Sequence, residues 1–294
     1  MNHSLRKAAR RAPLFILMCV LGIVFATPLL FMFASSFKTD DAIFAKLTSW
    51  SAYVPNPDWS MANYVAIFGK SNLPAFLLNS TIIATAVVVG GVLINSMLAF
   101  ALCRMRWRGR QAVLSVVVAL MIIPFEVIAI PLLSLVARLP WPGIENGALT
   151  MQAGWFNSLH VQIIPFLANA FCVFLFYQFF RDIPKELDEA AKMDGAGPWA
   201  LFFRIILPNS GPVIATAAIV LFIAAWNQYL WPIMVVQGET ARPVQPGIQQ
   251  FFGRSNSWGQ IMAYASVVTL PVLAVFLAFQ RQFVASVAGS GIKG

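Results

Sequence analysis

The chain has 294 residues, of which 59% are hydrophobic and 11% are charged, and phenylalanine alone supplies 25 side chains. A soluble domain of this length cannot bury so much apolar surface, so the composition excludes an ordinary soluble protein and predicts a membrane protein. The net charge of +9 is explained by basic loops that set topology and contact anionic lipid, which leaves no reason to expect a nucleic-acid partner.

Six stretches are apolar over the roughly 17–25 residues that a helix needs to cross a hydrocarbon core of about 30 Å. They are residues 13–37, 79–102, 112–136, 161–180, 212–236 and 261–279. The first is too long for a signal peptide and lacks a cleavage pattern, so we expect it to be retained. The sequence predicts an all-α integral membrane protein with six transmembrane helices in one domain, 13–285, between tails at 1–12 and 286–294.

Basic side chains cluster in alternate connections between these stretches. The second and fourth connections and the end of the chain hold Arg104, Arg106, Arg108, Arg110, Arg181, Lys185, Lys192, Arg204, Arg281 and Lys293. Short loops rich in Lys and Arg stay in the cytoplasm, so both termini and residues 181–211 are predicted to face it. We therefore expect a multi-pass protein of the prokaryotic cytoplasmic (inner) membrane, in contact with its lipid.

Residues 181–211 form a long polar segment between two apolar stretches. Pro184 suits a first helical position and acidic residues follow it, so a short helix is expected to start there. One face of this helix carries the small residues Ala190 and Ala191, which would let another surface approach, and Gly195 suits a C-terminal cap with positive φ. A second, apolar-faced helix is expected after it. These residues alone leave open that the segment is an ordinary connector.

The order Glu189-Ala190-Ala191, three residues, Gly195, nine residues and Ile205-Ile206-Leu207-Pro208 resembles the EAA loop of binding-protein-dependent ABC importer permeases. The Asp-Gly-Ala form at 194–196 is similar to that of the carbohydrate-uptake subgroup, which includes the maltose permease. The resemblance covers residues 79–294 and implies a type I ABC importer permease fold. It also implies a coupling helix that docks in a cleft of the ATPase through Glu189, Ala190, Ala191, Asp194 and Gly195.

The resemblance implies three kinds of protein partner: a second homologous permease, a dimer of ABC ATPase subunits and an extracytoplasmic solute-binding protein. ATP and Mg²⁺ would be bound by the partner ATPase, with no cofactor on this chain. The residues agree, because Gly69-Lys70-Ser71 is the nearest approach to a phosphate-binding loop and Tyr64 stands where that motif needs its first glycine. No catalytic residue is expected, and no metal site either, since His160 has no second ligand at suitable spacing.

Polar residues within apolar stretches are costly in lipid and mark candidate contacts with a transported solute. Glu126 is the one acidic residue within a stretch, and Pro124 and Pro131 beside it favour a kinked helix. Three roles stay open for Glu126: contact with the solute, a bond to the partner permease, and proton relay. Asn79 and Asn95 are further path candidates, although asparagine in membrane helices often only holds helices together.

The fifth apolar stretch carries Trp226-Asn227-Gln228-Tyr229-Leu230-Trp231-Pro232 near its outer end. Flat aromatic faces and amides suit polyols and sugars, so the path candidates here are Trp226, Asn227, Gln228 and Tyr229. An interfacial aromatic belt is the alternative. The heptapeptide resembles that of the glycerol-3-phosphate importer's second permease, which implies sn-glycerol-3-phosphate or a related glycerophosphodiester as solute.

Several alternatives stay open. No Lys or Arg lies deep in an apolar stretch, so a neutral sugar or oligosaccharide is the alternative solute. An ion-coupled secondary transporter would normally show an internal repeat, and none is evident. The loop at 138–160, with Trp141 and Trp155, either contacts the binding protein or is an insertion without that role.

Overall fold

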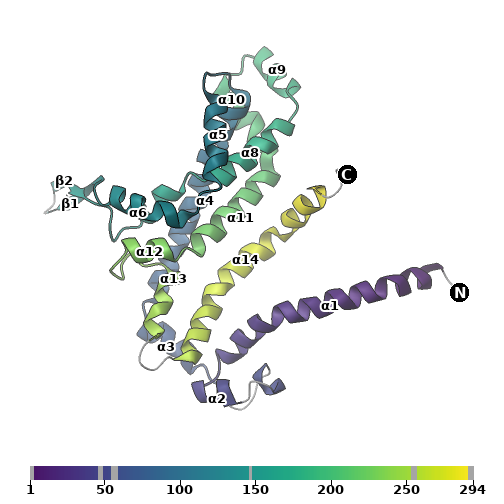
Figure 1. Ribbon diagram of the computed structural model, residues 1–294, viewed down its shortest axis with the longest axis vertical. Helices are drawn as coiled ribbons and strands as arrows, with labels where there is room; N and C mark the ends of the chain where they lie inside the picture. The colour runs from purple at the N-terminus through teal and green to yellow at the C-terminus, as the bar shows by residue number, and fades with distance from the viewer. Residues whose placement is uncertain (1–2, 46–48, 54–58, 146–147, 253–256, 291–294) are drawn as a thin grey trace. The chain divides into compact units, whose positions relative to one another are not determined.

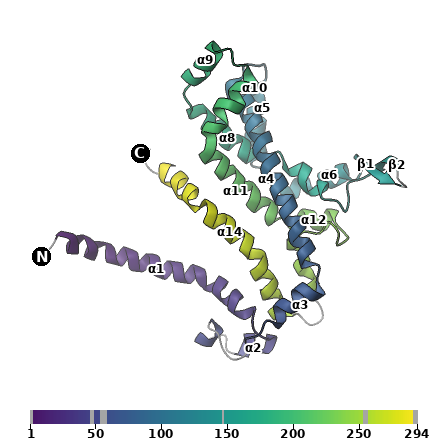
Figure 2. The same ribbon diagram turned by 180° about the vertical axis from the view of Figure 1, so that it is seen from behind.

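The computed structural model describes residues 3–45, 49–53, 59–145, 148–252 and 257–290, and most of them are helical (Figures 1 and 2). The chain packs as two compact units. The first comprises Met1–Leu73 and Ile248–Pro271, and the second comprises Pro74–Gly247 and Val272–Gly294. One boundary between them falls inside the last helix, α14 (Trp258–Ser290).

The first unit contains α1 (His3–Ser35), α2 (Asp40–Ala45), the 3₁₀ turn η1 (Trp50–Ala52), α3 (Ala62–Lys70), the turn η5 (Ile248–Phe251) and the start of α14. The start of α14 is fastened to the segment after α1. Asp40 Oδ1 accepts a hydrogen bond from the N–H of Gly259 at 2.7 Å, and a Cβ at Gly259 would lie 2.6 Å from the Lys38 carbonyl oxygen. Glycine is thus what allows the two segments to approach so closely.

The second unit holds the remaining elements. They are α4 (Leu73–Arg104), α5 (Arg110–Leu120), α6 (Phe125–Val136), β1 (Pro140–Glu145), β2 (Ala148–Ala153), α7 (His160–Ile163), η2 (Ile164–Phe166), α8 (Ala170–Asp182), α9 (Glu186–Met193), α10 (Pro198–Leu201), η3 (Phe202–Ile206), η4 (Pro208–Ser210), α11 (Gly211–Trp226), α12 (Leu230–Val235) and α13 (Val244–Gly247). Both views show α4, α5, α8 and α11 grouped together, with α9 and α10 at one end of the group.

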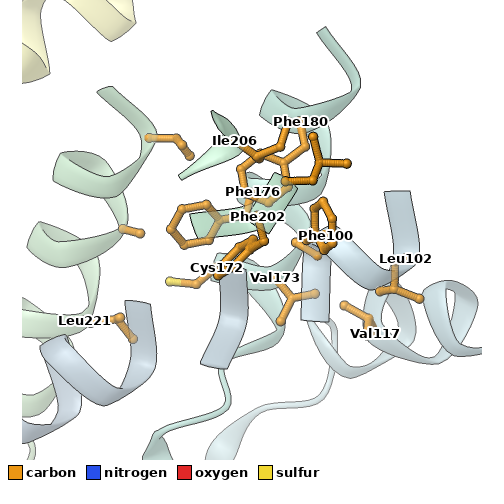
Figure 3. Close-up of a cluster of buried hydrophobic side chains, with 14 of the residues drawn as sticks. Phe100, Leu102, Val117, Cys172, Val173, Phe176, Phe180, Phe202, Ile206 and Leu221 are labelled. Atoms are coloured by element: carbon orange, nitrogen blue, oxygen red, sulfur yellow. The ribbon is translucent and has the colours of Figure 1, made fainter. Parts of the chain in front are cut away.

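The core of the second unit is aromatic and lies where α4, α5, α8, η3 and α11 meet (Figure 3). Phe176 and Phe180 of α8 are fully buried, and Phe202 of η3 is 1% exposed. The rings of Phe100 and Phe202 lie 5.2 Å apart between centroids. Full burial of each such side chain stabilises the fold by about 1.5–3 kcal/mol. This core therefore holds the helix ends beside the polar segment in fixed positions.

In the part of the chain that the structure describes, four helices are long and apolar enough to cross a membrane: Ala12–Ser35, Leu73–Arg104, Pro208–Trp226 and Trp258–Gln280. Two bent pairs meet the same test, Arg110–Leu120 with Phe125–Val136 at 109° and His160–Phe166 with Ala170–Asp182 at 40°. Counted as one span each, these pairs complete the six predicted spans. The prediction of single helices over 112–136, 161–180 and 212–236 is wrong, because each of these ranges contains a break.

Two of these breaks have a local cause. Pro124 is the N-cap of α6 in extended conformation, which confirms the kink expected there, since proline lacks the N–H that would continue α5. Asn169 caps α8, and its Oδ1 accepts a hydrogen bond from the N–H of Cys172 at 3.0 Å. α11 ends at Trp226, so residues 226–232 run from the end of α11 into α12 and do not belong to one helix.

The connection at 138–160 contains a β-hairpin, which the all-α prediction did not include. β1 and β2 pair antiparallel, with Gly143 opposite Thr150. The ring of Trp141 stacks on that of His160 with centroids 3.8 Å apart. Aromatic stacking therefore fastens the base of the hairpin to the start of α7.

Candidate functional site

The polar segment at 181–211 carries a short helix, α9, as the sequence predicts. It begins at Glu186, two residues later than the predicted start at Pro184. Ile183 is extended (φ −69°, ψ 129°), the conformation favoured before proline, and Lys185 takes the N-cap position. The first turn then carries Glu186, Asp188 and Glu189, where the helix dipole stabilises negative charge.

The C-terminal end of α9 is closed by a glycine cap. Gly195 has a φ of 79°, which confirms the predicted left-handed conformation. The N–H of Gly195 donates to the Lys192 carbonyl at 3.0 Å, and the N–H of Ala196 donates to the Ala191 carbonyl at 2.9 Å. These two bonds form a Schellman motif, which satisfies carbonyls that a helix end otherwise leaves unpaired.

A buried ion pair joins α9 to the end of α4. Arg104 Nη1 lies 2.9 Å from Asp188 Oδ2, and the two side chains are 4% and 10% exposed. Arg104 Nη2 also donates to the carbonyls of Phe180 and Ile183, at 2.6 Å each. We call these contacts the Arg104 clamp, because one guanidinium holds the ends of α4 and α8 and the first turn of α9 together.

No sequence pattern predicts the Arg104 clamp. Arg104 belongs to a basic loop that indicates membrane topology, and Asp188 is one of the acidic residues that favour a helix start after Pro184. The two residues are 84 positions apart, so no local spacing pattern relates them.

Four of the predicted docking residues, Glu189, Ala190, Asp194 and Gly195, are exposed along α9 and its cap. Ala191 is 6% exposed and packs in the aromatic core, so its side chain presents no surface to a partner. Met193, which the sequence analysis did not include, is 89% exposed. The outer side of α9 is thus a small, mixed apolar and acidic surface on a fixed helix.

The second helix expected after α9 is present as α10 followed by the π-helical turn η3. The N–H of Leu207 donates to the Phe202 carbonyl at 2.9 Å, which is the i→i+5 bond of a π-helix. Phe202 and Ile206 are buried in the core, whereas Trp199 and Phe203 are exposed. The segment is therefore anchored twice, by the Arg104 clamp before the glycine cap and by the aromatic core after it.

Two of the candidate path residues are engaged inside the chain. Asn79 Nδ2 donates to the carbonyl of Arg242 at 3.0 Å. Asn95 Nδ2 donates to the Leu167 carbonyl at 3.0 Å, and its Oδ1 accepts from the N–H of Asn169 at 2.8 Å. Both asparagines are buried. We assign them to fastening α4 to other segments of the unit and no longer to the solute path.

The other polar candidates lie at the break between α11 and α12. Trp226 is buried, whereas Asn227 and Tyr229 are exposed and Gln228 is half-buried. Gln228 also lines a cavity of about 60 Å³ with Gln162 and Asn169. That volume holds a few water molecules at most. Sites for small ligands measure about 300–1,000 Å³, so this cavity is too small to be one.

Gln162 is a candidate that the sequence analysis missed. It is 1% exposed, and its Oε1 has no hydrogen-bond partner within the described residues. Its Nε2 donates to the Ala241 carbonyl at 2.9 Å. A buried, unpaired carbonyl oxygen beside a small polar cavity favours bound water at the breaks of the fourth and fifth spans. The one sequence signal for Gln162 was its amide side chain within an apolar stretch.

Glu126 lies in the first turn of α6, directly after the 109° bend. The helix N-terminus favours its negative charge. Its side chain is exposed, and within the described ranges no cation lies at ion-pair distance. Glu126 is therefore open to a partner or solute outside the chain, and its three possible roles stay predictions.

The family model for binding-protein-dependent transport system inner membrane components matches residues 91–289. The chain belongs to this family. The sn-glycerol-3-phosphate transport system permease protein UgpE of Pectobacterium atrosepticum is 34% identical to it over 217 residues, 73% of this chain and 72% of that protein. The trehalose/maltose transport system permease protein MalG of Thermococcus litoralis is 30% identical over 285 residues, 94% of each chain.

Solved structures agree on the fold. A bacterial ABC transporter involved in the import of the acidic polysaccharide alginate matches with a TM-score of 0.75 over 96% of this chain and 98% of its own, at 19% identity. The alginate transporter in complex with an alginate pentasaccharide-bound periplasmic protein matches with a TM-score of 0.60 over 94% and 96%, again at 19% identity. The family and the fold make this chain an inner-membrane permease of a binding-protein-dependent ABC sugar importer, and not an enzyme.

Proposed function

We propose that this permease forms half of the translocation path for sn-glycerol-3-phosphate or a related glycerophosphodiester. The identity to a glycerol-3-phosphate permease and the polar break at residues 227–229 support this solute. Exposed Asn227 and Tyr229 offer an amide and a phenol that bond to polyol hydroxyls.

A neutral sugar or oligosaccharide is the second candidate. The polar side chains at the breaks are amides and a phenol, Gln162, Asn227, Gln228 and Tyr229, with no cation among them to neutralise a phosphate. The relative named for trehalose and maltose supports this alternative. With a phosphate-bearing solute, the stabilising charge would come from the companion permease or from helix N-termini.

Energy would reach the path through α9. The Arg104 clamp is the observation that carries this part of the proposal, since it fixes α9 to the ends of α4 and α8. A helix held in this way passes rigid-body motion to the spans that it contacts. Docking in the ATPase cleft would use Glu189, Ala190, Asp194 and Gly195, all of which are exposed.

The assembly that we propose contains a second, homologous permease, a dimer of ABC ATPase subunits and an extracytoplasmic solute-binding protein. ATP and Mg²⁺ would be bound by the ATPase subunits, and this chain would hold no cofactor. Both termini and α9 would face the cytoplasm, because the basic loops gather on that side.

Transport by the purified assembly tests this function. The chain is purified with the subunits that it retains, reconstituted in liposomes with its binding protein, and supplied with labelled sn-glycerol-3-phosphate or labelled maltose. We expect saturable uptake of the glycerol phosphate that requires ATP on the α9 side. Maltose uptake instead would establish the second candidate, and uptake driven by an ion gradient without ATP would refute the importer mechanism.

A further inference from the structure

A cavity of about 300 Å³ lies beside the Arg104 clamp, at the ends of α4, α5 and α8. Three cationic residues line it: Arg110 at the start of α5, Arg181 at the end of α8, and Lys185 just before α9. No carboxylate among the described residues lies at ion-pair distance from any of the three. Arg104 lines the same cavity, but its charge is paired with Asp188. The cavity thus concentrates positive charge that the chain itself does not neutralise.

Donors around this cavity match a phosphate group. Guanidinium groups bind phosphate oxygens with paired hydrogen bonds, and Arg110 and Arg181 supply two of them. Gln111 and Tyr177 add an amide and a phenol to the lining. The first turn of α5 also lies here, and the N–H groups of a helix N-terminus favour anions. The Nε of Arg104 is buried and has no hydrogen-bond partner in the described ranges.

The place of the cavity indicates the source of the phosphate. Leu102 and Leu114 form part of its lining, and the cavity lies at the ends of three apolar helices. A ligand here would meet cations on one side and apolar side chains on the other, as the headgroup region of a phospholipid does at the membrane boundary.

We propose that this cavity is a phosphate-binding site, occupied by the headgroup of an anionic phospholipid. The ligand and the site lie outside the solute path and the docking surface. A soluble phosphate shares the chemistry, and the experiment separates the two sources.

Native mass spectrometry of the full chain, purified in mild detergent with the subunits that it retains, tests the proposal. The probes are phosphatidylglycerol, phosphatidylcholine and inorganic phosphate. We expect the wild type to retain phosphatidylglycerol in preference to phosphatidylcholine. Each cation near a membrane surface is worth about fivefold in binding of an anionic lipid, so R110Q/R181Q should lower this preference by roughly 25-fold.

The matched control is R106Q/R108Q, which removes the same charge from the loop before α5, at positions that are exposed, as Arg110 and Arg181 are, but do not line the cavity. It should leave the preference unchanged, and R110K/R181K should retain most of it. If R110Q/R181Q and R106Q/R108Q lost the lipid preference equally, the preference would come from general surface charge and the proposed site would be wrong. If inorganic phosphate binds through Arg110 and Arg181 and the lipid preference is absent, the phosphate site stands with a soluble source. If no probe depends on these arginines, the proposal is wrong.

Discussion

Gly195 shows how one residue fixes the end of α9. Its φ of 79° is accessible to glycine at little cost, whereas other L-residues pay about 1–2 kcal/mol there. A Cβ at this position would have no atom within 4 Å, so the constraint is backbone conformation and not space. The cap therefore depends on glycine even though the site is open.

Gly195→Val should uncouple transport from ATP hydrolysis while the chain still inserts and assembles. Valine disfavours the left-handed conformation, so the Schellman bonds at the end of α9 weaken and the docking surface loses its shape. Solute-stimulated ATPase activity and uptake in proteoliposomes measure the effect. Gly197→Ala is the control, because Gly197 has a φ of −74° that alanine adopts readily. Normal uptake by the valine variant would remove Gly195 from the docking assignment.

Arg104 carries a larger share of stability than a surface arginine. In Arg104→Met, Asp188 stays buried without a cation and two carbonyls lose their donor, which costs about 3–5 kcal/mol. Thermal unfolding in detergent should show the loss, and Arg106→Met, at an exposed position, should not. R104M/D188L should recover much of the stability, since no buried charge remains. A double variant as unstable as the sum of its single changes would show that the pair does not interact.

At the scale of elements, sequence patterns predicted the helices whose position depends on neighbouring residues in the chain. Runs of apolar residues gave α1, α4 and α14, and Pro184, Glu189 and Gly195 gave α9 to within two residues of its start. The break at Asn169 was missed because hydropathy is averaged over a window, and Asn169 is oriented by Asn95, which is 74 positions away. The hairpin was missed although Asn146-Gly147, between its strands, is the dipeptide most typical of such turns.

The Gly90-Gly91 pair sets how closely α4 packs against neighbouring segments. A Cβ at Gly91 would lie 2.9 Å from Leu221 Cδ1 and 3.3 Å from the Leu167 carbonyl oxygen. Gly91→Val should therefore lower the free energy of unfolding by about 1–3 kcal/mol, because the second contact is backbone and does not yield easily. Thermal unfolding measures the change. Gly22→Val in α1 is the control, since no atom lies within 4 Å of its Cβ position. Equal destabilisation of both variants would assign the effect to helix propensity.

At the scale of the whole molecule, the apolar spans are only partly covered by the chain itself. Buried residues make up 39% of the apolar stretch of α4 and 33% of the one that ends with α11, two helices of the second unit. The rest needs lipid, the first unit or a second permease to cover it. From the basic residues in alternate loops we predict that α9 and the hairpin lie on opposite sides of the membrane.

Cysteine labelling tests this topology directly. The native Cys19, Cys103 and Cys172 are first replaced by alanine. Met193→Cys on α9 and Met151→Cys on β2 then each introduce one thiol, and these positions are 89% and 66% exposed, respectively. A membrane-impermeant maleimide should label the cysteine at 151 in intact cells and that at 193 only in inverted vesicles. The two positions serve as each other's control, because both are exposed methionines in the same chain. Labelling of both cysteines from one side would place α9 and the hairpin on the same side of the membrane. That result would contradict the six-span topology, in which one span crosses the membrane between residues 151 and 193.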